Sequence, residues 1–325
     1  MKFHKYISYF FKFYILTKIN LLFSFLSSLN IPHDIDLLEY NKQIKLLIPT
    51  PEGSKQAVHP DIIYDSEAKI PFILAFTPYP FSIDKYENPC LVISYDGLHF
   101  FEEQKGINPI VPPPFYDHND DPDLYYKNGK WYILYLETLR PNAQNLVLLE
   151  SFDRITWTSR IIYSANLKNP NDFFMLSPSF IAQNDTINKI FFVNRSVSPY
   201  RIEYVMQTSG ENFDFYKRYP VSIDLNGLVP WHIDIIYGNN SYYMLLCTVK
   251  NNRNNKEYSL YIAKSNDLIS WTLSPKMVLH NSYRASGFIK NNDIFIYYSR
   301  QQGLFRPWHI GICRFKLSEF FKENL

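Results

Sequence analysis

A pattern of short polar starts followed by strand-like runs occurs five times in this sequence, about once every 50 to 60 residues. Each copy leads from the polar start into β-branched and aromatic residues, then through a turn rich in Gly, Asn or Lys into a second aromatic-rich run. A strand-and-turn unit repeated in this way is typical of radial architectures in which each copy forms one antiparallel blade. The pattern predicts an all-β, five-bladed β-propeller, because a β-sandwich gives no reason for the same polar start to recur. The starts lie at residues 59–64, 121–126, 177–181, 232–237 and 284–289.

The remainder of each repeat supports the same fold. Four copies close on Ser, then an acidic residue, then Phe or Trp, which fits a turn followed by an aromatic wedge between blades. Trp157 and Trp271 hold the wedge position in two of these copies. The second strands are expected at residues 72–76, 131–136, 190–193, 242–247 and 294–298.

Composition excludes several classes of protein. With 46% hydrophobic and 18% aromatic residues, the chain is too apolar to be disordered. A net charge of +2 gives no basic field of the kind that a dedicated nucleic-acid binder uses, so no nucleic-acid partner is expected. Cys90, Cys247 and Cys313 are too few and too scattered for a disulfide framework or a Cys-rich metal site.

The first 50 residues are expected to form an extension and residues 51–325 the propeller domain. Residues 1–30 contain no acid, and four lysines interrupt an apolar run that is too short between charges to span a bilayer. Three interpretations stay open: a signal peptide, a short basic amphipathic helix in a membrane interface, and a helix packed on its own domain. Peripheral membrane contact through residues 1–30 is therefore an option, and a cytoplasmic or membrane-peripheral location is favoured over secretion.

An ordered set of short motifs accompanies the repeats. The motifs are His59-Pro60-Asp61, Thr77-Pro78-Tyr79-Pro80, Glu87-Asn88-Pro89, Asp121-Pro122-Asp123, Ser177-Pro178-Ser179, Trp231-His232-Ile233-Asp234, Tyr283-Arg284-Ala285 and Trp308-His309-Ile310-Gly311. With these motifs the chain resembles the five-bladed propeller glycosidases, the clan of glycoside hydrolase families 43, 62, 32 and 68, and within it a family-43-like group of bacterial and phage proteins. The resemblance covers about residues 57–315. It implies a glycoside hydrolase that acts on an oligosaccharide or polysaccharide by carboxylate acid/base catalysis in the propeller funnel.

The candidate site follows from the propeller geometry, because the start of each innermost strand points into the central funnel. By resemblance to family 43, Asp61 would be the general base and Asp123 the carboxylate that orients the acid. The family places a Glu at the third-blade start, where this chain has Ser177 and Ser179. The candidates for the general acid are therefore Asp234, which ranks first, Glu87, and Glu203 in the outer part of the third blade. The expected substrate-binding residues are His59, Asp121, Ser177, Ser179, His232, Tyr283, Arg284 and His309, together with the aromatic residues Tyr79, Trp231 and Trp308.

Two other functions stay open. The missing third-blade Glu favours a non-catalytic sugar-binding propeller, whereas Arg284, Arg300 and Arg306 could hold an anion and favour a phosphorylase or a transferase in surface-polysaccharide metabolism. No metal site is expected, because the histidines and acids lack a tight ligand spacing. We expect no cofactor, although a structural Ca²⁺ in the funnel, as in some members of family 43, is kept as an option. The sugar and the linkage are left undetermined.

Overall fold

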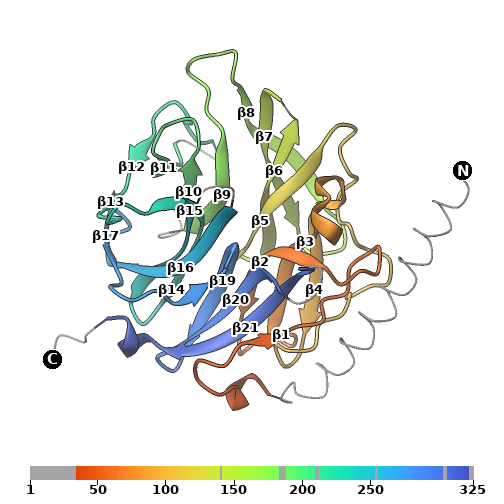
Figure 1. Ribbon diagram of the computed structural model, residues 1–325. Helices are drawn as coiled ribbons and strands as arrows, with labels where there is room; N and C mark the ends of the chain where they lie inside the picture. Colours follow the sequence, from red (N-terminus) through yellow and green to blue (C-terminus); the bar gives the residue numbers. More distant parts are fainter. Residues whose placement is uncertain are drawn as a thin grey trace, which may run out of the picture.

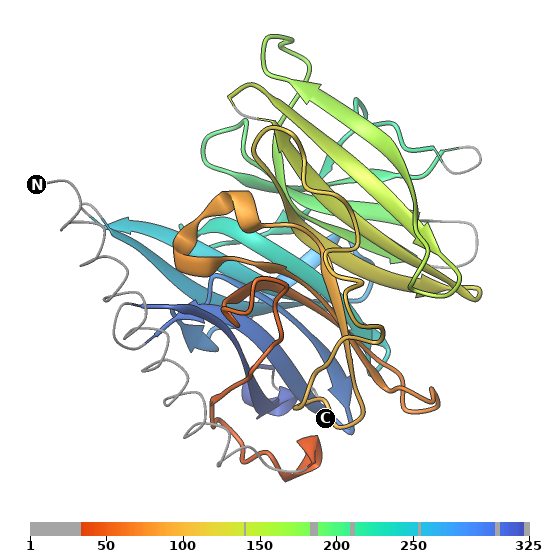
Figure 2. The ribbon, with the colours of Figure 1, turned by 90° about the vertical axis from the view of Figure 1, so that its right-hand side faces the viewer.

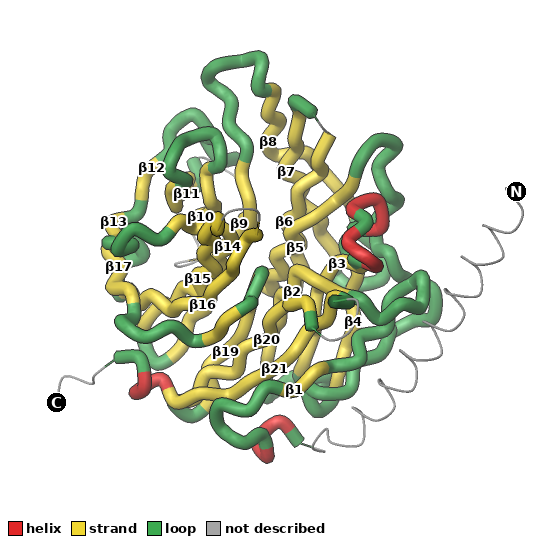
Figure 3. Tube along the Cα trace, viewed as in Figure 1, coloured by secondary structure: helices red, strands yellow, loops and turns green. Residues whose placement is uncertain are grey.

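The computed structural model describes residues 34–139, 141–182, 188–208, 212–252, 255–302 and 306–321. Its strands form five sheets arranged around one centre (Figure 1), which confirms the predicted all-β, five-bladed propeller. Helical structure in these ranges is limited to four short 3-10 turns (Figure 3). The expected helical extension falls within residues 1–33, outside the described residues. Among the described residues, no helix is long and apolar enough to cross a membrane.

Each blade is an antiparallel sheet whose first strand lies innermost, apart from short added strands at the outer edges. Blade one contains β2 (Ala57–Tyr64), β3 (Phe72–Pro78) and β4 (Cys90–Ser94). Blade two contains β5 (His118–Lys127), β6 (Lys130–Leu139), β7 (Ala143–Ser151) and β8 (Thr158–Asn166). Blade three contains β9 (Met175–Ala182), β10 (Asn188–Asn194), β11 (Arg201–Met206) and β12 (Tyr219–Pro220). Blade four contains β14 (Val229–Gly238), β15 (Ser241–Asn252), β16 (Asn255–Ser265), β17 (Ser270–Leu273), β18 (Leu279–His280) and β13 (Ser222–Ile223).

The innermost strands make a closed ring. β2, β5, β9 and β14 each contact the next innermost strand, and β19 (Arg284–Lys290) of blade five contacts both β14 and β2. The second strands that the sequence predicted all fall within β3, β6, β10, β15 and β20 (Asp293–Gln301), so those predictions are confirmed. The polar starts therefore surround one axis, as the repeat pattern requires.

Blade five is completed by residues that precede blade one. β1 (Ile44–Lys45) pairs with β21 (Trp308–Lys316), with Ile44 opposite Ile312, and the Leu46 amide donates to the Ile310 carbonyl at 2.9 Å. The sheet of blade five thus joins the two ends of the ring. Its pairing with β1 also protects the edge of β21. The propeller consequently begins before the boundary expected at residue 51.

Apolar side chains fill the space between neighbouring blades. Trp271 packs with Phe191 and Trp231 between blades three and four, and the half-buried Trp157 packs between blades one and two. This is the wedge role expected for Trp157 and Trp271. The side view in Figure 2 shows the connection between β3 and β4, which carries η2 (Pro80–Ser82) and η3 (Asp84–Tyr86).

Candidate functional site

Two layers of polar side chains line the axis of the propeller. Each innermost strand supplies one residue to each layer at spacing i, i+2, because alternate residues of a strand face the same side. None of the ten side chains belongs to a residue that is more than 4% exposed. The upper ring consists of His59, Asp121, Ser177, His232 and Arg284. The lower ring consists of Asp61, Asp123, Ser179, Asp234 and Ser286.

Three upper-ring residues have an uncommon backbone conformation. His59, Asp121 and Ser177 have φ values of +52°, +51° and +48°, and a proline follows each of them. The strand register shifts at all three places, as in a β-bulge. Non-glycine residues adopt such φ values at a cost of about 1–3 kcal/mol, and they cluster at functional sites. The bulges bend the strands where their side chains meet at the axis.

A buried ion pair lies at the centre of the upper ring. Arg284 Nη1 donates to Asp121 Oδ1 at 2.7 Å, and Asp121 Oδ2 accepts from the Ser177 amide at 2.8 Å. Burial alone would raise the pKa of Asp121, but the charges of His232, Arg284 and His59 hold it well below its usual value. Arg284 is fully buried in this pair. An anionic substrate would therefore have to displace Asp121 to reach Arg284.

His59 lies between two carboxylates. Its Nδ1 is 3.1 Å from Glu87 Oε2 and 3.0 Å from Thr77 Oγ1, and its Nε2 is 3.6 Å from Asp121 Oδ1. Burial lowers the pKa of His59, but Asp121 and Glu87 outweigh burial and raise it. For Glu87 burial dominates and raises the pKa, although His59 opposes it. The site thus contains one carboxyl group whose pKa is raised and one whose pKa is lowered.

His232 contacts Ser177 and Asp121 through the same ring nitrogen. Its Nδ1 is 2.6 Å from Ser177 Oγ and 3.4 Å from Asp121 Oδ1. A Ser-His-Asp relay needs one ring nitrogen for each partner, so this cluster is no such relay. Burial lowers the pKa of His232 well below its usual value. The buried Nε2 atoms of His59 and His232 have no hydrogen-bond partner among the described residues.

Aromatic side chains gather beside the upper ring. The Tyr283 ring lies 4.7 Å from that of His232 and 5.1 Å from that of Trp308, measured between ring centroids. Tyr79 is 5.5 Å from Trp308, and Trp231 is 6.4 Å from Tyr283. The structure therefore brings together the four aromatic residues expected to bind substrate. His309 is buried in β21, where its surroundings lower its pKa to about 3, chiefly through burial, and its Nδ1 has no hydrogen-bond partner among the described residues.

The lower ring fastens each blade to the next. Asp61 Oδ1 accepts from Ser286 Oγ at 2.7 Å, and its Oδ2 accepts from the Leu124 amide of blade two. Both carboxylate oxygens of Asp61 are therefore occupied. Three further lower-ring side chains accept a backbone N–H from a neighbouring blade in the same way. These are Asp123 from Phe180 at 2.8 Å, Ser179 from Ile235 at 3.2 Å, and Ser286 from Ile62 at 3.0 Å.

Three lower-ring carboxylates lie close together. Ligand oxygens of Asp61, Asp123 and Asp234 are within 4.8 Å of one another, and Asp234 Oδ2 has no partner among the described residues. Burial raises the pKa of all three; repulsion from Asp61 adds to this at Asp234, whose pKa reaches about 7. The group must be partly protonated or neutralised by a cation. His59, Asp121 and His232 form a second close group, but the Arg284 guanidinium on Asp121 opposes a cation there.

The sequence reasoning missed an acidic cluster beside Glu87. His118 is 3.1 Å from Asp120 Oδ2 through its Nε2, and it also contacts Asp117; these carboxylates outweigh burial and raise its pKa to about 10. Asp84 lies close enough to Asp117 and His118 to share a metal ion with them. The cluster adjoins Glu87, whose carbonyl accepts from the Asn119 amide at 3.1 Å. The run of polar residues just before Asp121 was the signal that could have found it.

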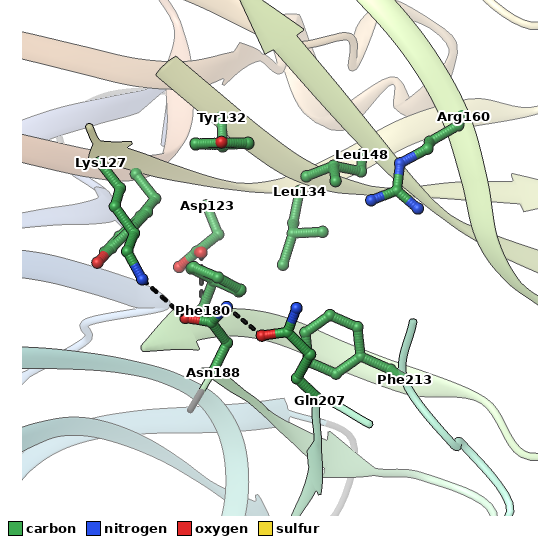
Figure 4. A pocket seen from close by; sticks show the side chains of 11 residues that line it. Asp123, Lys127, Tyr132, Leu134, Leu148, Arg160, Phe180, Asn188, Gln207 and Phe213 are labelled. Carbon is green, nitrogen blue, oxygen red and sulfur yellow. Dashed lines mark hydrogen bonds between the residues drawn. The ribbon is translucent and has the colours of Figure 1, made fainter. Parts of the chain in front are cut away.

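A small cavity reaches Asp123 from between blades two and three (Figure 4). Its volume is about 80 Å³, and Tyr125, Phe180 and Phe213 are among the residues that line it. Tyr125 follows Asp123 along β5, away from Asp121, so the cavity lies on the side of the lower ring opposite the upper ring. Asp123 thus borders a cavity, but one too small for a sugar ring with its hydroxyl groups.

The chain was compared with known sequences. No family model matches it. A segment of 75 aligned residues is 37% identical to the A type blood N-acetyl-α-D-galactosamine deacetylase of Flavonifractor plautii, covering 22% of this chain and 10% of that protein. Another 75-residue match is 32% identical to a probable sucrose-6-phosphate hydrolase of Psychromonas ingrahamii, covering 23% of this chain and 14% of that protein. The chain therefore spans only a small part of the length of these curated relatives.

Solved structures resemble the chain over most of its length. An N-acetylgalactosamine deacetylase from F. plautii, in complex with blood group B trisaccharide, has a TM-score of 0.69 at 19% identity, covering 82% of this chain and 91% of that one. The native arabinanase of Bacillus subtilis has a TM-score of 0.57 at 12% identity, covering 82% and 96%. A family 43 endo-arabinanase from Bacillus licheniformis has a TM-score of 0.54 at 12% identity, with the same coverage. The chain thus has the five-bladed propeller fold of glycoside hydrolase family 43 enzymes, as predicted.

Proposed function

We propose that this protein is a carbohydrate-active hydrolase that cleaves a glycosidic bond at the upper ring, with Glu87 as general acid and Asp121 as the ionised carboxylate. The observation that carries the proposal is that Glu87 and Asp121 lie on either side of His59 and that their surroundings shift their pKa values in opposite directions. Pairs of carboxyl groups separated in pKa are what glycosidic acid/base catalysis needs. Two solved structures of the same fold support a glycan as the substrate: the F. plautii N-acetylgalactosamine deacetylase in complex with blood group B trisaccharide, and the α-L-arabinanase of Cellvibrio cellulosa complexed with arabinohexaose.

In this proposal, water attacks beside the two histidines of the upper ring. A water held at the unpartnered Nε2 atoms of His59 and His232 would lie near the Asp121 carboxylate. Of the four aromatic residues beside the upper ring, the half-buried Tyr283 would contact the sugar, since aromatic side chains beside polar groups bind sugar rings.

The lower-ring carboxylates take different roles in this proposal. The assignment of Asp61 as general base stays a prediction. Asp61 and Asp123 accept backbone N–H groups of the next blades, as Asp121 does, so hydrogen bonding does not separate them. Their pKa values differ, because burial raises those of Asp61 and Asp123 whereas neighbouring positive charges lower that of Asp121. We therefore assign the ionised carboxylate to Asp121 and the general acid to Glu87.

The test is release of reducing sugar from a panel of oligosaccharides and aryl glycosides. Glu87→Gln and Asp121→Asn should each lower kcat by about 10²-fold or more, since positioned acid/base groups contribute about 10²–10⁴-fold. The exposed Glu67→Gln is the matched control and should keep full activity. Activity should fall as the pH rises through the raised pKa of Glu87. In the Glu87→Gln protein, the remaining activity should no longer show this decrease. Full activity in a folded Glu87→Gln protein would overturn the assignment, and so would Asp61→Asn as the only inactive variant.

A second candidate reaction is removal of an N-acetyl group from an amino sugar. It is favoured by the composition of the upper ring, which holds two histidines and one carboxylate, and by the short match to a protein named as a deacetylase. Incubation with N-acetylated oligosaccharides distinguishes the two reactions, because acetate release without new reducing ends supports deacetylation. A thermal shift with no product of either kind would instead support a non-catalytic sugar-binding propeller.

A further inference from the structure

A groove separates blades one and two at the end of the propeller away from the upper ring. β2 runs from His59 to Tyr64 before the turn that includes Asp65, and β5 runs from Asp121 to Lys127 before the turn that includes Gly129. Both turns line the groove, whose volume is about 610 Å³. Ligand pockets commonly have volumes of about 300–1,000 Å³, so a sugar of a few units has room here. We call this space the blade one–two groove.

Three exposed aromatic side chains line this groove, one from β5 and two from bends that follow β4 and β7. Tyr95 is 59% exposed, Tyr126 45% and Phe152 77%, and all three line it. Trp131, which is buried, forms part of the lining beside Tyr126, with 4.4 Å between the ring centroids. Burying three such rings would stabilise a monomeric protein, so their exposure around one groove calls for a ligand with flat apolar faces.

The charged groups of the groove balance one another. Asp65 and Glu103 are its acids, and Lys69 and Arg154 are its bases. Arg154 Nε donates to Glu103 Oε2 at 2.8 Å within a two-point ion pair, which leaves further oxygen and N–H groups for hydroxyl groups to bond. Because the charges cancel, the groove offers no field for an anionic or cationic ligand, and it suits a neutral, hydroxyl-rich one.

We propose that the blade one–two groove is a second carbohydrate-binding site, which takes a neutral oligosaccharide segment of a polymeric glycan. The proposal rests on the proposed function in one respect, namely that the bound polymer is also the substrate of the upper ring. Holding the polymer at a second place raises its effective concentration at the reaction site without any new catalytic group. Loss of the groove should therefore raise KM for polymer and leave kcat unchanged, while hydrolysis of short substrates stays as it is.

The first measurement is polymer binding without turnover. The Glu87→Gln protein is run through gels containing neutral polysaccharides (arabinan, xylan, galactan and glucan), and binding is read as retardation. Adding Tyr95→Ala and Phe152→Ala should weaken binding about tenfold or more, since each stacked ring contributes on the order of 1 kcal/mol. Tyr237→Ala is the matched control, because Tyr237 is a 61% exposed tyrosine outside the groove. It should bind like its parent.

The second measurement is kinetic and uses the protein with its upper ring intact. Tyr95→Ala with Phe152→Ala should raise KM on the retained polymer and leave kcat/KM on a short aryl glycoside unchanged. If no neutral polysaccharide retards the protein, the groove site is overturned. The same holds if the protein is retarded equally with and without the aromatic rings of the groove. Groove-dependent retardation with no sugar released by the unmodified protein would leave the groove site standing and overturn the proposed hydrolase. The two proposals therefore fail in distinguishable ways.

Discussion

At the scale of single residues, burial decides which charges the propeller axis can carry. Asp121 keeps its charge because Arg284, His59 and His232 surround it. For Asp234, burial and repulsion from Asp61 outweigh the charge of Arg284, and its pKa rises to about 7. Removing one partner of a buried ion pair is costly, about 3–5 kcal/mol, because it leaves a charge uncompensated. The two rings therefore differ in chemistry although their residues alternate along the same strands.

Asp121 should make stability depend on acid pH. Its folded-state pKa is depressed, so its contribution is present above its unfolded value of about 3.9 and is lost as the pH falls through the folded value. The free energy of unfolding of the unmodified protein should decline below about pH 4. The Asp121→Asn protein should be less stable than the unmodified protein at pH 6. Its free energy of unfolding should also decrease less as the pH falls below about 4. Denaturant titrations at several pH values measure both, and parallel curves for the two proteins would contradict the role given to this carboxylate.

The option of a structural Ca²⁺ in the funnel, kept open beside the expectation of no metal site, can be tested at Asp61, Asp123 and Asp234. If they hold an ion, excess calcium should raise the melting temperature and a chelator should lower it. At a calcium concentration one hundred times Kd, the free energy of unfolding should increase by about 2.7 kcal/mol. Asp234→Asn should remove this response, while Glu67→Gln should keep it. The same melting curve with calcium and with chelator would mean that protons neutralise these carboxylates.

At the scale of elements, the innermost strand β19 has little room beside its neighbour β20. Gly287 lies in β19, and a Cβ added there would sit 2.3 Å from the carbonyl oxygen of Phe295 in the neighbouring strand. The strand contacts both neighbouring innermost strands, so it has few ways to shift. Packing, and not a special backbone angle, therefore makes glycine necessary at this position.

Gly287→Ala should destabilise the fold by about 1–3 kcal/mol, the usual cost of overpacking a core. Ile161→Ala in β8 is a suitable control, because Ile161 is exposed and should change stability by less than half a kilocalorie or so. Chemical denaturation of both variants measures the difference. If Gly287→Ala proved as stable as the unmodified protein, the ring of innermost strands would be looser than the structure indicates.

At the scale of the whole molecule, the propeller depends on contacts between its two ends. β1 completes blade five, and Leu46 and Ile48 beside it are buried in the same core cluster as Phe72 of blade one and Tyr297 of blade five. A short segment before the first blade thus holds first and last blades together. Such a closed ring should unfold as one unit, because opening it exposes the edges of two blades.

Leu46→Ala should test this closure. Removing a buried leucine side chain costs about 2–5 kcal/mol, and here the loss should lower the midpoint for all blades together. Leu37→Ala is the matched control, since Leu37 is 67% exposed in the same segment. Circular dichroism and tryptophan fluorescence should report one shared, lowered transition for Leu46→Ala. No change in midpoint would show that the contact between blades one and five suffices for closure.

The sequence by itself determined the number of blades, the positions of the second strands and nine of the ten ring residues, because all of these follow from local alternation and a repeated start. Tertiary structure alone decided what those residues touch. Glu87 meets His59 across blade one, Arg284 is bound to Asp121 of a distant blade, and Ile44 pairs with Ile312 at the opposite end of the chain. Such contacts depend on how the blades close around the axis. A local sequence pattern does not show which partner each carboxylate oxygen contacts. The opposite shifts in the pKa values of Asp121 and Asp61 could therefore be recognised only in the folded chain.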